Sequence, residues 1–86
     1  MKIRVVYTGR SYQTAESLPG ELTLSDGARL DDALRAISDC LPAAEPLPTT
    51  CLVSLAGRHR GTVARHTDDV LNDGDELVLI APVAGG

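Results

Sequence analysis

The chain has 86 residues, enough for one small domain with a limited core. Hydrophobic residues make up 43% and charged residues 23%, with neither Trp nor Phe, so the core must be aliphatic. The net charge of -4 argues against nucleic-acid binding, which favours basic surfaces, and no apolar run approaches the roughly 20 residues of a membrane span. Because "MKIRVVYTG" has too short an apolar run for a secretory signal, we expect a cytoplasmic protein.

The first quarter of the chain predicts two strands. Residues 2–8, "KIRVVYT", place Ile3, Val5 and Tyr7 on one face. After a polar loop that ends in a Pro-Gly turn signal, residues 21–24, "ELTL", predict a short second strand. We expect these neighbouring strands to pair antiparallel.

A helix is predicted next, because the apolar period changes after residues 26–27. Five residues at helical spacing form one stripe: Leu30, Ala33, Leu34, Ile37 and Leu41. Asp31 and Asp32 lie in the first turn, where negative charge favours the positive end of the helix dipole. Pro42 ends the helix, and residues 42–50, with three prolines, are expected to form a stiff connector.

The second half predicts extended structure with one ambiguous stretch. Residues 51–57, "CLVSLAG", are rich in branched side chains and predict a strand that Gly57 closes. Further on, residues 61–64, "GTVA", predict a brief strand, and Val70 and Leu71 are expected to dock on the core.

Residues 76–81, "ELVLIA", predict the last strand, with Leu77 and Leu79 on one face and Val78 and Ile80 on the other. The order of elements indicates an α+β fold, a mixed sheet of four to five strands with one main helix packed on one face. If the first and last strands lie side by side in the middle of the sheet, apolar residues on both of their faces are explained. That is the β-grasp, or ubiquitin-like, arrangement, with a domain at 1–81 and a tail at 82–86.

Independent catalysis is poorly supported by the residue types present. Cys40 and Cys51 form no CxxC unit, and with only two His no metal site is predicted. His59 and His66 have no nucleophile at a familiar spacing, and no glycine-rich phosphate loop occurs. We therefore expect both cysteines to be reduced and buried as small hydrophobic residues, and we expect no bound cofactor and no enzyme acting alone.

The chain ends in Gly85-Gly86, which has two interpretations. Chain ends are commonly frayed, and glycine loses the most backbone entropy on ordering. Alternatively, the terminal carboxylate is the working group, and the glycines let it enter a narrow site.

Three stretches carry a family resemblance: "MKIRVVY", "LSDGARLDDALRAI" and, most strongly, "LNDGDELVLIAPVAGG". A DGDE turn, an apolar strand, a Pro-Val step and a terminal Gly-Gly resemble the ubiquitin-like sulfur-carrier family (MoaD/ThiS-like), closest to the small subunit of molybdopterin synthase. The chain departs from this pattern at Thr8, where an aromatic residue is usual, at Arg29, where a Ser or Thr cap is common, and at Ala81.

The resemblance implies chemistry at the tail. An E1-like adenylating enzyme, using ATP and magnesium, would activate the carboxylate of Gly86. A persulfide donor would convert it to a thiocarboxylate, which delivers sulfur in the active site of an acceptor such as the molybdopterin synthase large subunit. A Cβ at Gly86 or Gly85 would crowd this chemistry, and Pro82, which cannot donate a strand hydrogen bond, would help project the tail.

The resemblance also implies a docking face, formed by Thr8, His59, Ile80, Pro82, Val83 and Ala84. The locally basic residues 58–66 either orient the protein on a partner or are neutralised by the acidic stretch that follows.

Other functions stay open: a sulfur carrier for thiamin or another thio-metabolite, a ubiquitin-like protein modifier, and a non-covalent interaction domain. The Pro-Val step favours molybdenum-cofactor synthesis.

Overall fold

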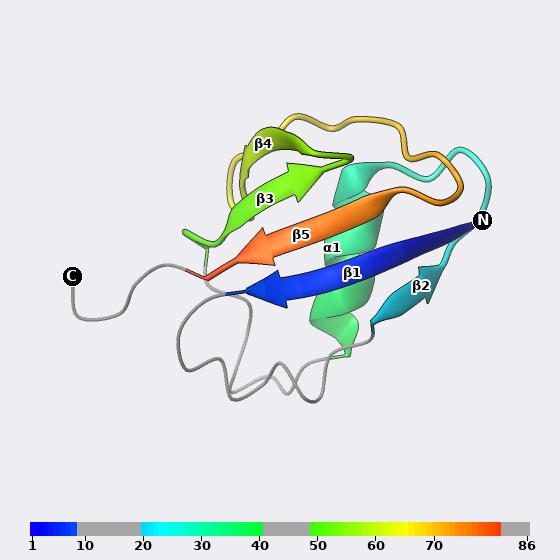
Figure 1. Cartoon of the computed structure of the whole chain (residues 1–86), viewed down its shortest axis with the longest axis horizontal. Coiled ribbons are helices and arrows are strands. Elements are labelled where there is room, and N and C mark those ends of the chain that lie inside the picture. The colour runs from blue at the N-terminus through cyan, green and yellow to red at the C-terminus, as the bar shows by residue number, and fades with distance from the viewer. Residues whose placement is uncertain (9–19, 41–48, 82–86) are drawn as a thin grey trace.

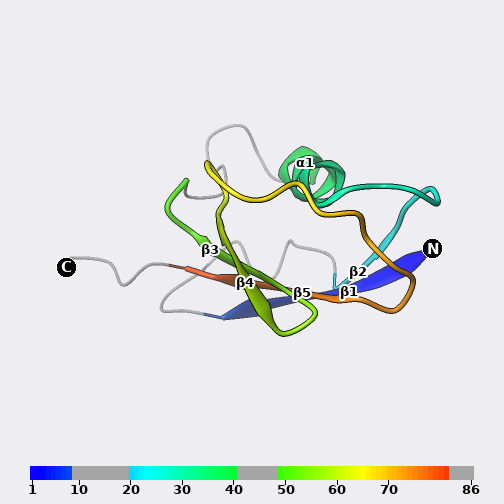
Figure 2. The ribbon, with the colours of Figure 1, turned by 90° about the horizontal axis from the view of Figure 1, so that it is seen from above.

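The computed structural model describes residues 1–8, 20–40 and 49–81, which form a helix packed on one face of a five-stranded sheet (Figures 1 and 2). In chain order the elements are β1 (Lys2–Thr8), β2 (Glu21–Thr23), α1 (Leu30–Asp39), β3 (Leu52–Leu55), β4 (Arg58–Thr62) and β5 (Glu76–Ile80). The strand order is β2-β1-β5-β3-β4. The predicted α+β fold, with one helix on one face of a mixed sheet, is confirmed.

Strands β1 and β5 lie side by side inside the sheet and run parallel. Their register pairs Val5 with Leu77 and Tyr7 with Leu79. The pairs β1–β2, β3–β5 and β3–β4 are all antiparallel, as predicted for the first of them. The first and last strands therefore meet within the sheet, as the apolar residues on both of their faces indicated.

The core lies between α1 and the sheet. Leu77 and Leu79 of β5 are almost completely buried, and the predicted helical stripe is buried against them from Leu30 to Ile37. The whole buried apolar set is Ile3, Val5, Leu22, Leu30, Ala33, Leu34, Ile37, Cys51, Val53, Leu55, Leu71, Leu77 and Leu79. Leu41, the fifth residue of the predicted stripe, lies outside the described residues. None of the described helices is long and apolar enough to cross a membrane.

The predicted strand at 61–64 is wrong in its bounds, because β4 begins three residues earlier, at Arg58. A two-residue turn joins β3 to β4, and both its residues have positive φ, 51° at Ala56 and 81° at Gly57. Such a turn matches the twist of a hairpin, but it is usually signalled by Asn-Gly or Gly-Gly. The Ala-Gly pair lacks this signal, so the sequence did not place residues 58–60 in a strand.

The prediction that Val70 docks on the core is also wrong, whereas Leu71 is buried as expected. Val70 is 50% exposed. Residues 70 and 71 lie in extended backbone, held by the bond from the Leu71 N–H to the Ala28 carbonyl at 2.9 Å. Adjacent side chains of extended backbone point to opposite sides, so only one of the two reaches the core.

The start of α1 lacks a Ser or Thr cap, and a loop distant in the sequence supplies hydrogen-bond acceptors for two N–H groups of the first turn. Arg29 donates its N–H to the Asp32 carboxylate at 2.8 Å. The Asp68 carboxylate accepts the Asp31 N–H at 3.3 Å, and the Asp69 carbonyl accepts the Leu30 N–H at 2.8 Å. These bonds satisfy N–H groups of the first turn that have no partner inside the helix.

Gly61 is the residue of β4 that a side chain would disturb most. Its φ is 120°, and a Cβ there would overlap the Arg65 carbonyl oxygen and lie 3.0 Å from the Cα of His66. We expect Gly61→Ala to lower the free energy of unfolding by about 2 kcal/mol or more, through strain and displaced backbone. Urea unfolding monitored by circular dichroism measures this loss.

Gly20→Ala is the matched control, because Gly20 has no positive φ and no atom within 4 Å of the added Cβ. It should change the free energy of unfolding by less than about 0.5 kcal/mol. Equal effects of the two substitutions would contradict the close approach at Gly61.

Candidate functional site

The sheet face opposite α1 carries two rows of side chains that the strand register aligns. One row runs from Thr8 through Ile80 and Leu52 to Thr62. The next row contains Val6, Val78, Ser54 and His59. Because strands are about 4.8 Å apart, each row crosses about 14 Å of the sheet.

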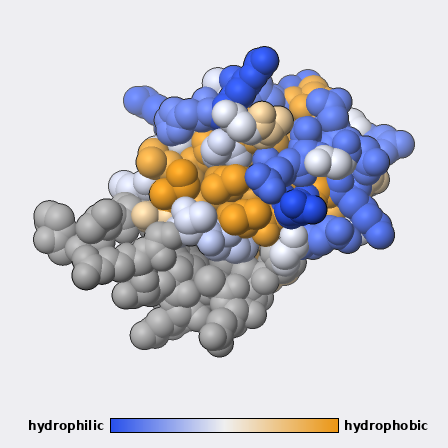
Figure 3. Space-filling model, in the orientation of Figure 1, coloured by the Kyte–Doolittle hydropathy of each residue, from blue (hydrophilic) through white to orange (hydrophobic). Residues whose placement is uncertain are grey.

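The centre of these rows is apolar and forms what we call the outer-face patch: Val6, Leu52, Val78 and Ile80. Ile80 is 38% and Leu52 39% exposed, and Val6 and Val78, in the next row, are partly buried. Figure 3 shows hydrophobic side chains gathered toward the carboxyl ends of β1 and β5, with hydrophilic ones toward the amino ends. An exposed apolar group of this kind, bordered by polar residues, is typical of a docking surface.

The polar end of the same face is internally neutralised. Arg4 and Glu76 are adjacent in the register, and their side-chain nitrogen and oxygen lie 3.5 Å apart. Lys2 and Glu21 approach to 3.9 Å. The end of the sheet where the tail begins therefore differs from the other end in its exposed apolar side chains, and not in an excess of unpaired charge.

The tail begins at the edge of the outer-face patch. The Ala81 N–H donates to the Thr8 carbonyl at 2.9 Å, which extends the β1–β5 ladder one residue past Ile80. The next residue, Pro82, has no N–H to donate. The bond at Ala81 is thus the last hydrogen bond of the β1–β5 ladder among the described residues.

The structure brings together three of the docking residues implied by the resemblance. Thr8 and Ile80 are direct neighbours in one row, and His59 lies on the same face at the β4 edge. The other implied residues, Pro82, Val83 and Ala84, together with Gly85 and Gly86, lie outside the described residues, so their roles stay predictions. The proposed boundary between a 1–81 domain and an 82–86 tail stays a prediction for the same reason.

Sequence reasoning missed Leu52, which lies beside Ile80 in the register and is equally exposed. Its alternation with buried Val53 was available in the sequence, but in a dense apolar run neither residue stands out. Only the pairing with β5 shows that Leu52 adjoins the start of the tail.

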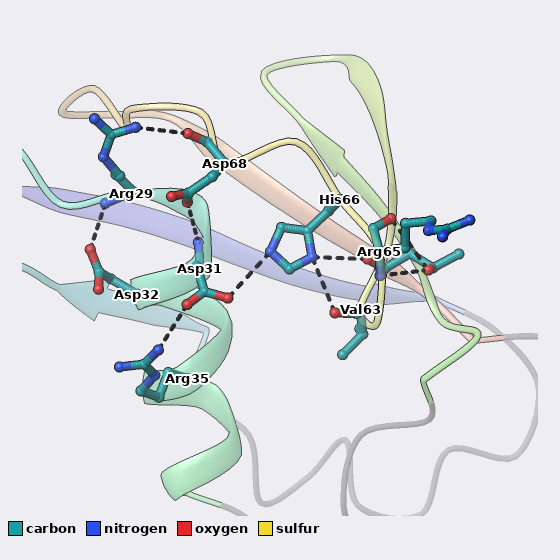
Figure 4. Close-up of polar contacts among 9 residues, drawn as sticks. Arg29, Asp31, Asp32, Arg35, Val63, Arg65, His66 and Asp68 are labelled. Carbon is teal, nitrogen blue, oxygen red and sulfur yellow. Dashed lines mark hydrogen bonds and ion pairs between the residues drawn. The ribbon is translucent and has the colours of Figure 1, made fainter.

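Two residues of the basic segment 58–66 contact carboxylates outside the segment. Arg60 Nε lies 3.0 Å from Asp69 Oδ2. Figure 4 shows His66 beside the start of α1, where its Nε2 lies 3.5 Å from Asp31 Oδ1. His66 Nδ1 is 3.0 Å and 3.1 Å from the Thr62 and Val63 carbonyls, which can only accept, so Nδ1 is the donor. Among the described residues, the pair Arg60–Asp69 is the one ion pair between this basic segment and the acidic stretch that follows it, so the choice between the two interpretations stays open.

The described residues include no group of three or more His, Cys, Asp or Glu side chains placed to hold a metal ion. Cys51 is buried at the start of β3, and Cys40 is exposed at the end of α1; both are free thiols, as expected, but burial was predicted for both and only Cys51 is buried. Burial raises the pKa of the Cys51 thiol, and its contact with the Ile80 backbone opposes that shift.

Comparison with known proteins places this fold and tail in a family. The ThiS family model matches residues 5–86, from β1 through the terminal Gly-Gly. The chain belongs to the ThiS family. The prediction of a ubiquitin-like sulfur carrier is thereby confirmed at the level of the family.

This ThiS-family chain has full-length relatives. It is 33% identical over 86 residues to a molybdopterin synthase sulfur carrier subunit of Chlamydomonas reinhardtii, with both chains covered completely. It is 35% identical over 91 residues to an uncharacterized protein of Archaeoglobus fulgidus, again with complete coverage of both. The solved structure of SAMP1 from Haloferax volcanii matches all of both chains with a TM-score of 0.67 at 20% identity, which supports the β-grasp fold.

Because Ile80 is exposed and Leu79 is buried, an aspartate should affect stability very differently at these two neighbouring positions of β5. We expect Ile80→Asp to change the free energy of unfolding by about 1 kcal/mol or less, because its side chain already meets water. Leu79→Asp should unfold the protein, because an unpaired carboxylate would be buried against α1. Thermal unfolding of both variants measures the difference, and a large loss in Ile80→Asp would make Ile80 a core residue.

The two thiols of the ThiS-family chain should differ in reactivity. With its pKa raised and its side chain buried, Cys51 should react with iodoacetamide far more slowly than exposed Cys40 in the folded protein. Because folding disfavours the Cys51 thiolate, stability should fall as the pH rises above the unfolded thiol pKa of about 8.5. Peptide mapping after timed labelling measures the rates, and equal rates in the folded and urea-unfolded protein would contradict burial of Cys51.

Proposed function

We propose that this ThiS-family protein carries sulfur as a thiocarboxylate on Gly86 and delivers it to an acceptor enzyme, most specifically for molybdopterin synthesis. The observation that supports this is the position at which the tail begins, directly after Ala81. The last ladder bond, Ala81 to Thr8, lies beside the outer-face patch, and five residues ending in Gly-Gly follow it.

The geometry suits a partner that holds the sheet while it acts on the tail. Five residues span at most about 18 Å when fully extended. A partner that binds Ile80 and Leu52 can therefore receive the terminal carboxylate in an active-site channel that opens on the partner's surface up to about 18 Å away. The same patch and tail serve two partners in turn, one that loads the sulfur and one that accepts it.

Activation precedes sulfur transfer, because an ionised carboxylate is a poor electrophile. A carboxylate oxygen of Gly86 attacks the α-phosphorus of ATP on an E1-like enzyme that holds magnesium, and pyrophosphate leaves. A persulfide sulfur then attacks the acyl carbon and AMP leaves. Reduction of the resulting acyl disulfide by a thiol releases the thiocarboxylate, a nucleophile that attacks the acceptor substrate.

Glycine at the last two positions fits this sequence of steps. A Cβ on Gly86 would crowd the approach to the activated acyl carbon, and one on Gly85 would widen a segment that threads a channel. The choice of molybdopterin rests on the name of the Chlamydomonas reinhardtii relative and on the Pro-Val step before the glycines.

The test is sulfur loading in vitro, followed by intact mass measurement. With an adenylating enzyme, ATP, magnesium and a persulfide donor, the wild-type chain should gain the mass of one sulfur replacing one oxygen on the C-terminal peptide. Gly86→Val should lose loading at least about 100-fold, because a branched side chain crowds the acyl carbon, and should unfold at the wild-type temperature.

The matched control is Ser38→Val, an exposed position on α1, which covers the face of the sheet opposite the patch, and it should load normally. Ile80→Asp should fold but load poorly, because the loading enzyme docks on the outer-face patch. Normal loading of Gly86→Val would contradict the tail chemistry. A wild-type chain joined to lysines of other proteins and never thiolated would identify a protein modifier.

A further inference from the structure

The outer-face patch is too small to decide by itself how a partner docks. A specific protein interface buries about 800 Å² on each partner. The four side chains of the patch fall well short of that area, because the two most exposed, Leu52 and Ile80, are only 39% and 38% exposed. Apolar contact is also non-directional. A partner that receives the tail in its active site therefore needs further contacts on this face that fix its orientation.

A third row of side chains continues the two rows of the outer face toward the amino ends of β1 and β5. In the strand register, Arg4 of β1 is paired with Glu76 of β5 and with Glu21 of β2. Since side chains on one face of a strand recur every two residues, this row lies about 7 Å from Val6 and Val78. The outer face thus carries a row of negative, positive and negative charge across β2, β1 and β5, directly beside the apolar patch.

The charged side chains at this end of the face are held loosely. The closest nitrogen–oxygen distances are 3.5 Å between Arg4 and Glu76 and 3.9 Å between Lys2 and Glu21. Both distances exceed the roughly 2.8 Å of a charge-assisted hydrogen bond. All four side chains are 48% or more exposed, and exposed ion pairs contribute little to stability. A partner can therefore separate these charges and bind them at small cost to the fold.

The backbone beneath the same charges is held firmly. The Lys2 N–H donates to Asp73 Oδ1 at 2.8 Å, and the Gly74 N–H donates to the Lys2 carbonyl at 2.8 Å. The Arg4 N–H donates to the Asp75 carbonyl at 2.9 Å. These bonds fasten the turn before β5 onto β1, and the turn and the charged side chains border a hollow of about 500 Å³. Side chains of a partner have room there, beside charges whose positions along the strands are fixed.

We propose that the row Glu21, Arg4 and Glu76 orients the enzyme that loads the tail. The enzyme presents a carboxylate to Arg4, flanked by basic side chains that face Glu21 and Glu76, beside its apolar contact with the outer-face patch. An enzyme turned end to end would bury its charges against apolar side chains, so only one orientation satisfies both parts of the face. Because it concerns the loading enzyme, this role of the row rests on the proposed function.

The row lies far enough from the tail to orient the enzyme without obstructing it. Glu76 begins β5, and Ala81 follows the strand five residues later, about 17 Å away at the rise of an extended chain. An enzyme held both at Glu76 and at Ile80 has its active site beyond the carboxyl end of β5, where Gly86 can reach it.

The test is binding of the full chain to the adenylating enzyme of its own organism, measured by calorimetric titration without ATP. Arg4→Glu should bind about tenfold or more weakly than the wild type, because a charge-assisted hydrogen bond to the enzyme is lost. Arg35→Glu is the matched control and should leave the affinity unchanged. The Arg35 side chain is 72% exposed, as is that of Arg4, and also lies beside a carboxylate, but it belongs to α1 on the opposite side of the sheet.

Exchange of the two charges separates recognition from a structural role of the pair. The double variant Arg4→Glu with Glu76→Arg keeps the net charge and the ion pair within the chain, but reverses the charges that the enzyme meets. It should unfold at the wild-type temperature and still bind about tenfold or more weakly. Restored binding would assign the pair to the β1–β5 ladder and overturn the proposal. Equal losses in Arg4→Glu and Arg35→Glu, no loss in Arg4→Glu, or no binding of the wild type at millimolar concentration would overturn it too.

Loading assays distinguish failure of this proposal from failure of the proposed function. Arg4→Glu should need about tenfold more carrier for half-maximal loading, with the maximal rate unchanged, because the row acts in binding alone. Gly86→Val keeps the row, so it should bind with wild-type affinity and load poorly. Normal loading of the wild type together with unaltered binding of Arg4→Glu would overturn the role of the row alone. Tight binding of a wild-type chain that is never thiolated would overturn the sulfur chemistry alone.

Discussion

The parallel pairing of β1 with β5 is the interaction on which the rest of the molecule depends. It joins the first and last strands of the domain, so it forms only when the chain between them has folded back over the sheet. Leu77 and Leu79 fix its register, because they must face α1 to be buried. A shift of one residue would turn them to water and bring Val78 and Ile80 under the helix.

The functional face follows from that register by alternation. Once Leu79 is buried, Ile80 must point away from α1, beside Thr8 on one side and Leu52 on the other. The same ladder carries the chain to Ala81, so the outer-face patch and the start of the tail arise from one strand. The core and the outer-face patch thus use opposite faces of β5, which lets residues of the patch be altered with little effect on the core.

The polar residues after β4 mainly hold the domain together. Asp68 and Asp69 bond to the first N–H groups of α1. In the same loop, Asp69 also pairs with Arg60 of β4, and His66 lies 3.5 Å from Asp31 of α1. This loop completes a helix start that has no Ser or Thr cap of its own.

The sequence by itself determined the order of elements, the helical stripe from Leu30 to Ile37, the two faces of β5 and the Gly85-Gly86 end. These are local signals: period, turn residues and a motif at fixed positions. The turn at Ala56-Gly57, the exposure of Val70 and the place of Leu52 beside Ile80 were decided only by tertiary structure. The turn is local, but Ala-Gly is not a usual hairpin signal. The other two features depend on which distant strand or loop packs alongside, and residues 20 or more apart in the chain leave no periodic trace of that choice in the sequence.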